Sequence, residues 1–418
     1  MSRLDLVIFG ATGFTGKHAV MEMSRQLRQY PLSWGIAGRS QAKLADVIAE
    51  ASKKTGNDLS GVKIIIADVD NEKSLKDMCS QAKVLVNCCG PYRHYGEPVV
   101  RAAIDSMTHY VDVSGEPQFI ETMQLKYNEA AREAGVYVIS ACGFDSIPTD
   151  LGVVFLDKNF GGTVNSVESY LSSEAQGSIS GGVINYGTWE SLVYGISHLD
   201  ELPNLRKQIY PETLPELKPK LKPRTVLHQR LSGWCLPFPG SDASVVYRTQ
   251  RTLFEREGKR PIQIKTYVKF STLFSALVVG FSAVMLFILT RCGFTRNLLL
   301  KYPRLFTMGA ITREGPSEEV MNSTVFSVLL LGQGWAEGSD TNTPPNKKIA
   351  VKVSGVNPGY GATVVALLFS ALTILNEKEK MPKEGGVLTT GTAFKDTNII
   401  NNLHENNLKF EIVNEEFK

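Results

Sequence analysis

The amino-acid sequence predicts an α/β protein in which a Rossmann-type doubly wound parallel sheet precedes a second, mixed-sheet α+β domain. A strand, a glycine-rich turn and a helix start occupy residues 4–16. Strand-like and helix-like runs then alternate up to about residue 150, which is typical of a parallel sheet covered by helices. Beyond it the strand-like runs become longer and more irregular, and an uncharged apolar segment covers residues 270–290.

The glycine turn has the spacing Gly-x-x-Gly-x-x-Gly and indicates a dinucleotide site. Gly10 allows a tight turn, Gly13 lets the backbone approach a pyrophosphate, and Gly16 lets the helix pack closely on the strand. The helix N-terminus adds free N–H groups for the phosphates. A doubly wound domain without a nucleotide is the alternative. The expected cofactor contacts in this turn are Gly10, Thr12, Gly13, Phe14, Thr15 and Gly16.

The alternation that follows places the site at the carboxyl ends of the strands, where parallel sheets bind ligands. We expect Ser40 to cap the second helix and Gly135 to end the fifth. Strands after the first are predicted at Leu32–Ala37, Lys63–Ala67, Val84–Asn87, Tyr110–Val113 and Tyr137–Ser140. Helices are predicted at Thr15–Gln29, Gln41–Lys53, Lys73–Ser80, Pro98–Ser106 and Glu121–Ala134.

The end of the second strand favours NADP over NAD. An NAD site usually has an acidic residue there for the ribose 2′-hydroxyl, whereas this chain has Arg39 and Ser40, which suit a 2′-phosphate. The alternative for Arg39 is an ordinary solvent-facing residue. Asp68, at the end of the third strand, is expected either to bind the adenine amino group or to cap the helix that starts near Asn71.

The turn after the fourth strand, Cys89-Gly90-Pro91, is expected to lie beside the nicotinamide ribose. Side chains that could donate or accept a proton follow this strand and the next two. The alternatives are a surface or ribose-contacting role for His94 and loop capping by the two carboxylates. The candidate catalytic residues are Tyr92, His94, Glu116 and Asp145.

Several motifs together resemble those of the saccharopine dehydrogenase-like oxidoreductases, most closely the animal form and more distantly bacterial trans-acting enoyl reductases of complex-lipid synthesis. The resemblance implies an N-terminal NAD(P)-binding domain, a second domain that closes over the nicotinamide, and an oxidoreductase. The motifs are Gly-Ala-Thr-Gly-Phe-Thr-Gly (10–16), Ala-Gly-Arg-Ser (37–40), Asn-Cys-Cys-Gly-Pro-Tyr (87–92), Tyr-Val-Asp-Val-Ser-Gly-Glu (110–116), Gly-Phe-Asp-Ser-Ile-Pro-Thr-Asp-Leu-Gly (143–152), Asn-Pro-Gly-Tyr-Gly-Ala-Thr (357–363) and Gly-Gly-Val-Leu-Thr-Thr-Gly-Thr-Ala-Phe (385–394).

Length and composition narrow the function classes. At 418 residues the chain exceeds what one core usually fills, and its net charge of +3 is too small to suggest nucleic acid. The six cysteines and six histidines show no metal-ligand spacing, so we expect reduced thiols and no metal site. Because the first strand starts at Leu4, we expect no cleaved signal peptide.

The rest of the chain is divided into a second domain, 151–360, and a C-terminal helical segment, 361–418, that returns to the first domain, 1–150. A helix is predicted at Pro148–Leu156. Residues 201–241 are rich in proline and lysine and are predicted to form a mobile basic surface excursion. Strands are predicted at Thr163–Leu171, Ala243–Thr249, Asn322–Trp335 and Ile349–Ser354, the last two as an antiparallel hairpin.

The apolar segment 270–290 is long enough to cross a bilayer and has basic residues on both sides. Both flanks therefore favour the cytoplasmic face, so the segment is expected to lie in the interface, or to enter and leave on one side, of a membrane or a lipid-droplet monolayer. The upstream cations that would attract anionic headgroups are Arg248, Arg251, Arg256, Lys259 and Arg260. The alternative is a helix buried in the second domain or in a homodimer interface.

The function that combines these features is an NADP-dependent oxidoreductase on a membrane or lipid droplet, acting on a lipid-like substrate in lipid or glycolipid metabolism. One alternative is a cofactor-binding scaffold at the lipid surface without turnover. A second is a soluble amino-acid dehydrogenase of the saccharopine type, although the sequence shows no matching cluster of Arg and Lys for an amino-dicarboxylate.

Overall fold

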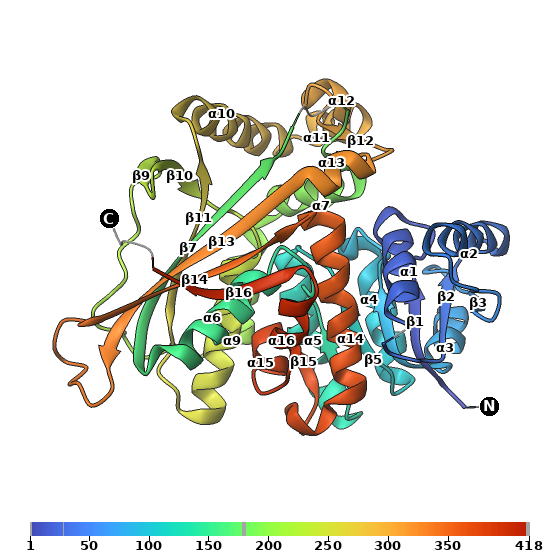
Figure 1. Ribbon diagram of the computed structural model, residues 1–418, viewed down its shortest axis with the longest axis horizontal. Helices are drawn as coiled ribbons and strands as arrows, with labels where there is room; N and C mark the ends of the chain where they lie inside the picture. Colours follow the sequence, from blue (N-terminus) through green and yellow to red (C-terminus); the bar gives the residue numbers. More distant parts are fainter. Residues whose placement is uncertain (1, 28, 178–180, 415–418) are drawn as a thin grey trace.

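The computed structural model describes residues 2–27, 29–177 and 181–414, which build two seven-stranded sheets side by side (Figure 1). The first sheet has the order β15-β6-β5-β4-β1-β2-β3, and its strand pairs are parallel. The second sheet has the order β16-β14-β13-β7-β11-β10-β9 and is mixed. The predicted fold class is therefore confirmed.

The first sheet alternates strands and helices as predicted. Its strands are β1 (Leu4–Phe9), β2 (Trp34–Gly38), β3 (Lys63–Ile66), β4 (Ala82–Asn87), β5 (His109–Asp112), β6 (Tyr137–Ile139) and β15 (Gly386–Leu388). Its helices are α1 (Phe14–Gln26), α2 (Gln41–Thr55), α3 (Glu72–Cys79), α4 (Tyr92–Asp105) and α5 (Pro117–Glu133). α4 starts six residues before the predicted Pro98, because groups outside the helix satisfy its first N–H groups.

Local capping explains where several of these helices begin and end. Ser40 accepts a hydrogen bond from the Lys43 N–H and caps α2, and Gly135 follows α5 with a φ of +63°, both as predicted. Asn71, rather than Asp68, caps α3 by accepting from the Ser74 N–H at 3.0 Å. The capping alternative for Asp68 is therefore wrong.

The second sheet follows α6 (Ile147–Phe160), which confirms the predicted helix. Its strands are β7 (Gly162–Ala175), β9 (His228–Arg230), β10 (Gly233–Pro237), β11 (Gln263–Phe270), β13 (Thr324–Ala336), β14 (Lys347–Val356) and β16 (Leu408–Val413). β13 and β14 form the predicted antiparallel hairpin. The strand predicted at Ala243–Thr249 is wrong, because this run lies in helix α9 (Asp242–Glu257), where Val245, Val246, Thr249 and Leu253 are buried at helical spacing.

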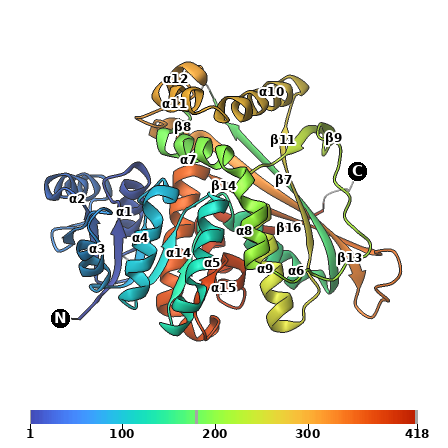
Figure 2. The same ribbon diagram turned by 180° about the vertical axis from the view of Figure 1, so that it is seen from behind.

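Further elements border the second sheet on the side of the first sheet's carboxyl edge (Figure 1). They are β8 (Ile184–Asn185), α7 (Tyr186–Ser197), α8 (Leu202–Ile209), α10 (Leu273–Thr290), α11 (Gly293–Lys301), α12 (Pro303–Phe306), β12 (Ile311–Thr312) and α13 (Glu318–Ser323), with β8 pairing β12. Figure 2 shows α8 and α9 beside α5 of the first half.

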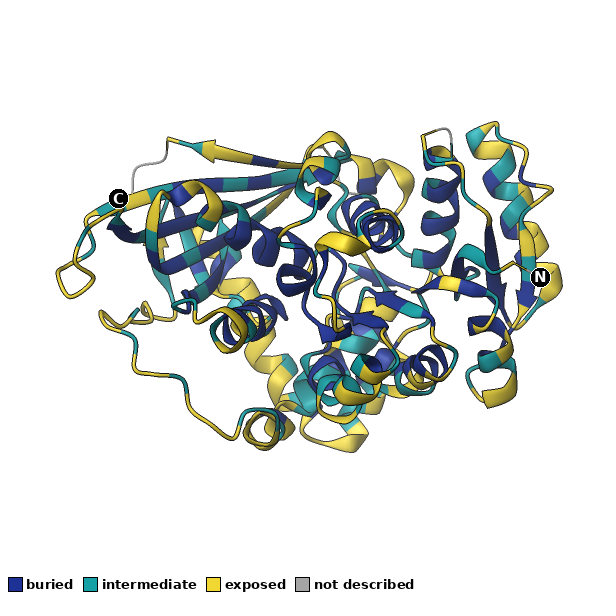
Figure 3. Cartoon of the chain, turned by 90° about the horizontal axis from the view of Figure 1, so that it is seen from below, coloured by how far each residue is buried: buried dark blue, intermediate teal, exposed yellow. Residues whose placement is uncertain are grey.

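The C-terminal segment serves both sheets, so its description as a helical return to the first domain is incomplete. α14 (Thr363–Asn376) packs against β4 and β5, and β15 extends the first sheet beside β6. The short helices α15 (Thr390–Phe394) and α16 (Ile399–Glu405) follow, and β16 then pairs with β14 in the second sheet. One hydrophobic core runs from β1 through α14 and α6 to β13. Figure 3 shows buried positions concentrated along the strands and inner helices.

Candidate cofactor and active site

The glycine turn after β1 has the geometry expected of a phosphate loop. Gly10 has a φ of +78°, and a Cβ there would lie 2.9 Å from the backbone of Cys88 and Cys89. A Cβ at Gly16 would lie 2.2 Å from the Gly10 carbonyl oxygen. Glycine is thus required at the turn and at the close approach of α1 to it.

The start of α1 presents N–H groups that no helical carbonyl takes. The first hydrogen bond of the helix runs from the Lys17 N–H to the Gly13 carbonyl oxygen, so the N–H groups of Phe14, Thr15 and Gly16 precede it. Gly13 is exposed and Thr12 is half-buried beside it. These groups fit a pyrophosphate, which needs several N–H donors and a backbone without side chains in the way.

Phe14 contributes its backbone rather than its ring to this loop. The ring packs edge-on against Tyr360, with centroids 4.5 Å apart, and against His18 at 4.9 Å. The Tyr360 hydroxyl accepts a hydrogen bond from the Asn185 N–H at 3.2 Å. The motif at 357–363 therefore joins the phosphate loop to β8 and α7.

Arg39 extends from the end of β2 into solvent. It is exposed, and among the described residues its guanidinium has no hydrogen bond or ion pair. The Ser40 hydroxyl is engaged in capping α2, and Asp68, at the end of β3, is half-buried and accepts from the Asp70 N–H at 3.2 Å. Arg39 is therefore the available cation for a 2′-phosphate, whereas no carboxylate ends β2.

A buried polar network, which the sequence did not reveal, fixes the strand ends beneath the second turn. Asp112 accepts hydrogen bonds from the hydroxyls of Tyr110 at 2.8 Å and Ser140 at 2.9 Å. Burial raises the pKa of Asp112 to about 6. Asn87 donates to the Tyr110 hydroxyl and accepts from the Cys89 N–H at 3.0 Å. The turn that continues through exposed Gly90 to buried Pro91 is thereby held in place.

Two of the four candidate catalytic residues are engaged in holding α4. Buried Glu116 accepts hydrogen bonds from the N–H groups of Tyr92 and Arg93, both at 3.0 Å, and from the Ser191 hydroxyl at 2.8 Å. Its carboxylate therefore caps the N-terminus of α4, as one of the predicted alternatives requires. The Tyr92 hydroxyl donates to the Asn87 carbonyl oxygen at 2.8 Å.

The other two candidates are accessible. His94 is exposed, and its ring stands edge-on to Tyr194 of α7, with centroids 4.7 Å apart. The Asp145 carboxylate is exposed and forms no hydrogen bond or ion pair with the described part of the chain. It lies beside Gly115, where a Cβ would be 3.0 Å from Oδ2, and desolvation by the surrounding protein raises its pKa. Asp145 is thus the one candidate here with a free acid group.

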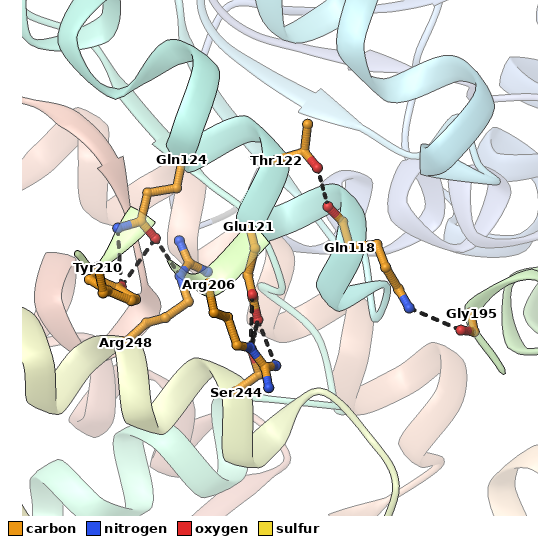
Figure 4. Close-up of polar contacts among 9 residues, drawn as sticks. All are labelled: Gln118, Glu121, Thr122, Gln124, Gly195, Arg206, Tyr210, Ser244 and Arg248. Carbon is orange, nitrogen blue, oxygen red and sulfur yellow. Dashed lines mark hydrogen bonds and ion pairs between the residues drawn. The ribbon is translucent and has the colours of Figure 1, made fainter. Parts of the chain in front are cut away.

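Helix α7 lies between these candidate residues and the apolar segment. On one side it supplies Ser191 to Glu116, Tyr194 to His94, and the Gly195 carbonyl oxygen to the Gln118 amide at 3.0 Å (Figure 4). On the other side, Trp189 donates to the Leu299 carbonyl oxygen of α11 at 3.1 Å.

The apolar segment forms α10, a surface helix (Figure 1). By length and composition it could cross a membrane, and only 17% of it is buried. Phe274 is 77% and Phe281 is 68% exposed, whereas Gly280 faces Leu236 of β10. The helix is therefore not buried inside this chain, and that alternative is wrong. The strands before and after it, β11 and β13, belong to one sheet, so a single crossing is incompatible with the fold.

Two of the arginines upstream of α10 do not face a lipid surface. Arg248 and Arg251 are 3% and 9% exposed in α9, and Arg248 donates to Gln124 of α5 at 2.6 Å (Figure 4). The expectation that these two attract headgroups is wrong, because their side of α9 is covered by protein. For exposed Arg256 and half-buried Lys259 and Arg260 it stays a prediction.

The proline-rich stretch 201–241 is a surface segment, but it is tied to the fold. Arg206 of α8 forms an ion pair at 2.8 Å with Glu121, which is 1% exposed and also accepts from the Ser244 hydroxyl (Figure 4). The same stretch contributes β9 and β10 to the second sheet. The stretch is therefore on the surface as predicted, but the expectation that it is mobile is wrong, because it is bound to the second half by these contacts.

Comparison with known proteins agrees with this geometry. The family model "Saccharopine dehydrogenase NADP binding domain" matches residues 6–139, which confirms the NADP prediction. A human "Saccharopine dehydrogenase-like oxidoreductase" is 40% identical over 98% of this chain and 97% of its own length. A Caenorhabditis elegans "Lipid droplet localized protein" is 39% identical over 99% of both chains.

More distant likenesses point the same way. A Mycobacterium tuberculosis protein described as a candidate trans-acting enoyl reductase is 27% identical over 94% of this chain and 93% of its own. Apo saccharopine dehydrogenase (L-Glu forming) from Saccharomyces cerevisiae has a TM-score of 0.53 at 14% identity, covering 98% of this chain and 100% of that one, and shows the fold alone. The near full-length relatives establish that this chain belongs to the saccharopine dehydrogenase-like NADP-binding oxidoreductases.

Proposed function

We propose that this protein is an NADP-dependent oxidoreductase that works on the surface of a membrane or lipid droplet and acts on a lipid-like substrate with a C=C, C=O or C=N bond. The observation that carries the proposal is the uncharged, exposed helix α10, which packs on α7 directly beside the candidate active site. The name of the nematode relative supports a lipid droplet as the surface.

The apolar surface extends from α10 into the next two helices. Phe294 of α11 and Leu305 of α12 are exposed, and Lys301 and Arg304 lie beside them. Such a surface gains free energy when it leaves water, and basic residues at its border suit phospholipid headgroups. Both ends of α10 continue into the same folded half, so attachment from the cytoplasmic side needs no crossing.

The residues of the candidate site have separate roles in the proposed reaction. The N–H groups at the start of α1 would hold the pyrophosphate, and Arg39 the 2′-phosphate. NADPH, when bound, supplies a hydride. Desolvation by the surrounding protein raises the pKa of Asp145, which favours its protonated form, and Asp145 would deliver that proton to the reduced substrate. Glu116 and Tyr92 hold the turn and α4 in position.

Turnover separates this proposal from its rivals. NADPH oxidation, followed by absorbance, is expected with a lipid extract. Saturable NADPH binding without oxidation of any extract would instead indicate a cofactor-binding scaffold. Oxidation or reduction confined to saccharopine, or to lysine with 2-oxoglutarate, would indicate an amino-acid dehydrogenase.

Attachment is tested with Leu277→Asp/Val284→Asp, two exposed positions of α10. Each charge costs about 2.5–3.5 kcal/mol at lipid depth, so flotation with droplets or vesicles should be lost while NADPH binding is kept. Leu125→Asp/Val226→Asp, also exposed and apolar but outside α10, is the matched control and should float normally. Equal flotation of both double variants would refute the lipid contact.

The role of Asp145 is tested with Asp145→Asn. We expect kcat to fall roughly 10²- to 10⁴-fold with the dissociation constant for NADPH unchanged. Because the acid must be protonated, wild-type kcat should fall as pH rises through its raised pKa, and the variant should lose this dependence. Asp77→Asn, on the exposed face of α3, is the control. Full activity of the Asp145→Asn variant would exclude the proton-donor role.

A further inference from the structure

The outer face of the second sheet holds a pocket that neither the cofactor nor the lipid contact uses. Residues 211–228, here called the strap, cross this face between α8 and β9. The Leu221 N–H donates to Gln263 Oε1 at 2.8 Å, and the Arg224 N–H donates to the Tyr267 hydroxyl at 3.2 Å. Between strap and sheet lies a cavity of about 580 Å³, a size typical of small-ligand sites.

The pocket is strongly basic. Four Lys or Arg side chains and one carboxylate, that of Glu168, line it, which leaves three net positive charges. Arg224 is bound to Glu168 by two hydrogen bonds of 2.7 Å. Lys222 and Arg230 have no ion-pair partner among the described residues. The cations that line the pocket are Lys222, Arg224, Arg230 and Lys348.

Two buried nitrogens in this lining make no hydrogen bond within the described chain. They are Nε of Arg230 and Nε2 of His228. A buried polar atom without a partner is costly, so each position calls for an external group. The lining amides and hydroxyls of Ser166, Thr225, Gln229 and Gln333 add further polar contacts.

Arg230 Nε needs a hydrogen-bond acceptor, whereas His228 Nε2 needs a donor. Arg230 Nε is a donor and requires an acceptor oxygen. Nδ1 of His228 lies 2.9 Å from the Thr225 carbonyl oxygen, so Nδ1 carries the hydrogen and Nε2 of the neutral ring is an acceptor. The ring is held edge-on to Tyr267, with centroids 4.9 Å apart, and burial lowers the His228 pKa. Nε2 therefore requires a donor such as a hydroxyl.

A phosphate ester of a polyol carries both groups, since its phosphate oxygens accept from Arg230 and Lys222 and its hydroxyls donate to His228. We propose that the strap pocket binds a phosphorylated polyol, of the glycerol phosphate or inositol phosphate class, either as a soluble molecule or as a phospholipid headgroup. This site is independent of the proposed reaction, because it lies on the opposite face of the second sheet from α6 and the core shared with the first sheet.

The first test is calorimetric titration with inorganic phosphate, sn-glycerol 3-phosphate and myo-inositol 1-phosphate, with NADPH saturating so that the cofactor site takes no phosphate. We expect one saturable site that prefers the polyol phosphates. Arg230→Gln and, separately, Lys222→Gln should weaken binding about 10-fold or more. Lys220→Gln, on the same strap but outside the lining, is the matched control and should change nothing.

His228→Phe isolates the hydroxyl contact. It should remove the preference for polyol phosphates over inorganic phosphate while leaving phosphate binding itself. Thermal unfolding of each variant shows whether it is folded, and Lys222→Gln, at an exposed position, provides a second variant if Arg230→Gln does not fold.

Vesicles distinguish the two sources of ligand. Phosphatidylcholine vesicles with and without phosphatidylinositol are compared, using the Leu277→Asp/Val284→Asp background to remove the α10 contact. Arg230-dependent binding of the free esters indicates a soluble ligand, and Arg230-dependent binding confined to phosphatidylinositol vesicles indicates a headgroup. No saturable binding to any probe, or equal losses in Arg230→Gln and Lys220→Gln, would overturn the proposal.

Discussion

Helix α10 and the helical span that ends in α14 are both apolar but have opposite surroundings. By length and composition, α10 and the span formed by α14 with the preceding turn Pro358–Ala362 could each cross a membrane. Their mean hydropathies are 2.4 over Leu273–Thr290 and 1.7 over Pro358–Asn376, yet 17% of the first and 78% of the second is buried. α14 is covered by β4 and β5 on one side and by α1 and α16 on the other, whereas the main contacts of α10 within the described residues are with α7, α11, β10 and β11. A long apolar run therefore identifies a helix whose surface is removed from water, but only its neighbours in the fold show whether the same chain covers it.

A charge in each helix should separate the two surroundings most strongly. Leu367→Asp, at a fully buried position of α14, should destabilise the protein by at least about 4 kcal/mol, because an unpaired charge is buried in the core. Leu277→Asp, on the exposed face of α10, should leave the unfolding midpoint nearly unchanged. Thermal or urea unfolding of the purified variants measures both. A large loss at Leu277 would mean that α10 is covered by protein, as in a homodimer.

Cofactor binding by the first sheet and lipid attachment by α10 should be separable by mutation. Arg39→Ala should remove about 1.5–3 kcal/mol of NADPH binding, or roughly 10- to 150-fold in affinity, and leave NADH binding and flotation unchanged. Fluorescence titration of both cofactors gives the ratio. Lys43→Ala, exposed in the first turn of α2, is the control. Equal wild-type affinities for NADPH and NADH would contradict an NADP-selecting role for Arg39.

A smaller effect concerns the buried carboxyl group at the start of α9. Asp242 of α9 is 5% exposed, and burial raises its pKa to about 8. The folded protein therefore retains a proton that the unfolded chain releases near the ordinary value of 3.8. The stability due to this proton is complete below that value and is lost as pH rises through about 8, by at most about 1.4 kcal/mol per pH unit.

Asp242→Asn cannot ionise, so its stability relative to the wild type should improve as pH rises from about 6 to about 9. Urea unfolding across this range measures the difference, with Asp77→Asn as an exposed control that should show none. A constant difference would indicate that water reaches Asp242 and that its pKa is not raised.

The features of the fold that depend on residues close together in the sequence could be predicted from the sequence. The Gly10 turn, the Ser40 cap and the strands up to β6 follow from spacing and residue type, and the structure confirms them. The strand prediction for Ala243–Thr249 was wrong because β-branched residues favour strands, whereas packing of α9 on α6, α15 and β11 favours the helix. Arg248 looked like a surface cation because its partner Gln124 is distant in sequence.

In the candidate site, too, local features could be predicted and contacts between distant segments could not. The candidate cofactor residues lie at strand ends, as the sequence predicted, and their contact with a cofactor stays a prediction. Capping by Glu116 was only one of two alternatives, and the sequence did not show that its partners would be the start of α4 and Ser191. Those bonds join segments that only the folded chain brings together. The basic pocket under the strap was equally hidden, because its lining comes from β7, β9, β13, β14 and the strap itself.

The position of α14 and β15 late in the chain has a consequence for biosynthesis. Residues 1–150 leave the ribosome well before residues 363–388, so the growing chain carries a parallel sheet whose β4 and β5 face lacks the helix that covers it. The apolar residues of α10 emerge in the same interval. A nascent chain of this protein therefore exposes two apolar surfaces at once, the face of β4 and β5 and the surface of α10. Synthesis of α14 covers the first of them, whereas no later segment that the structure describes covers α10.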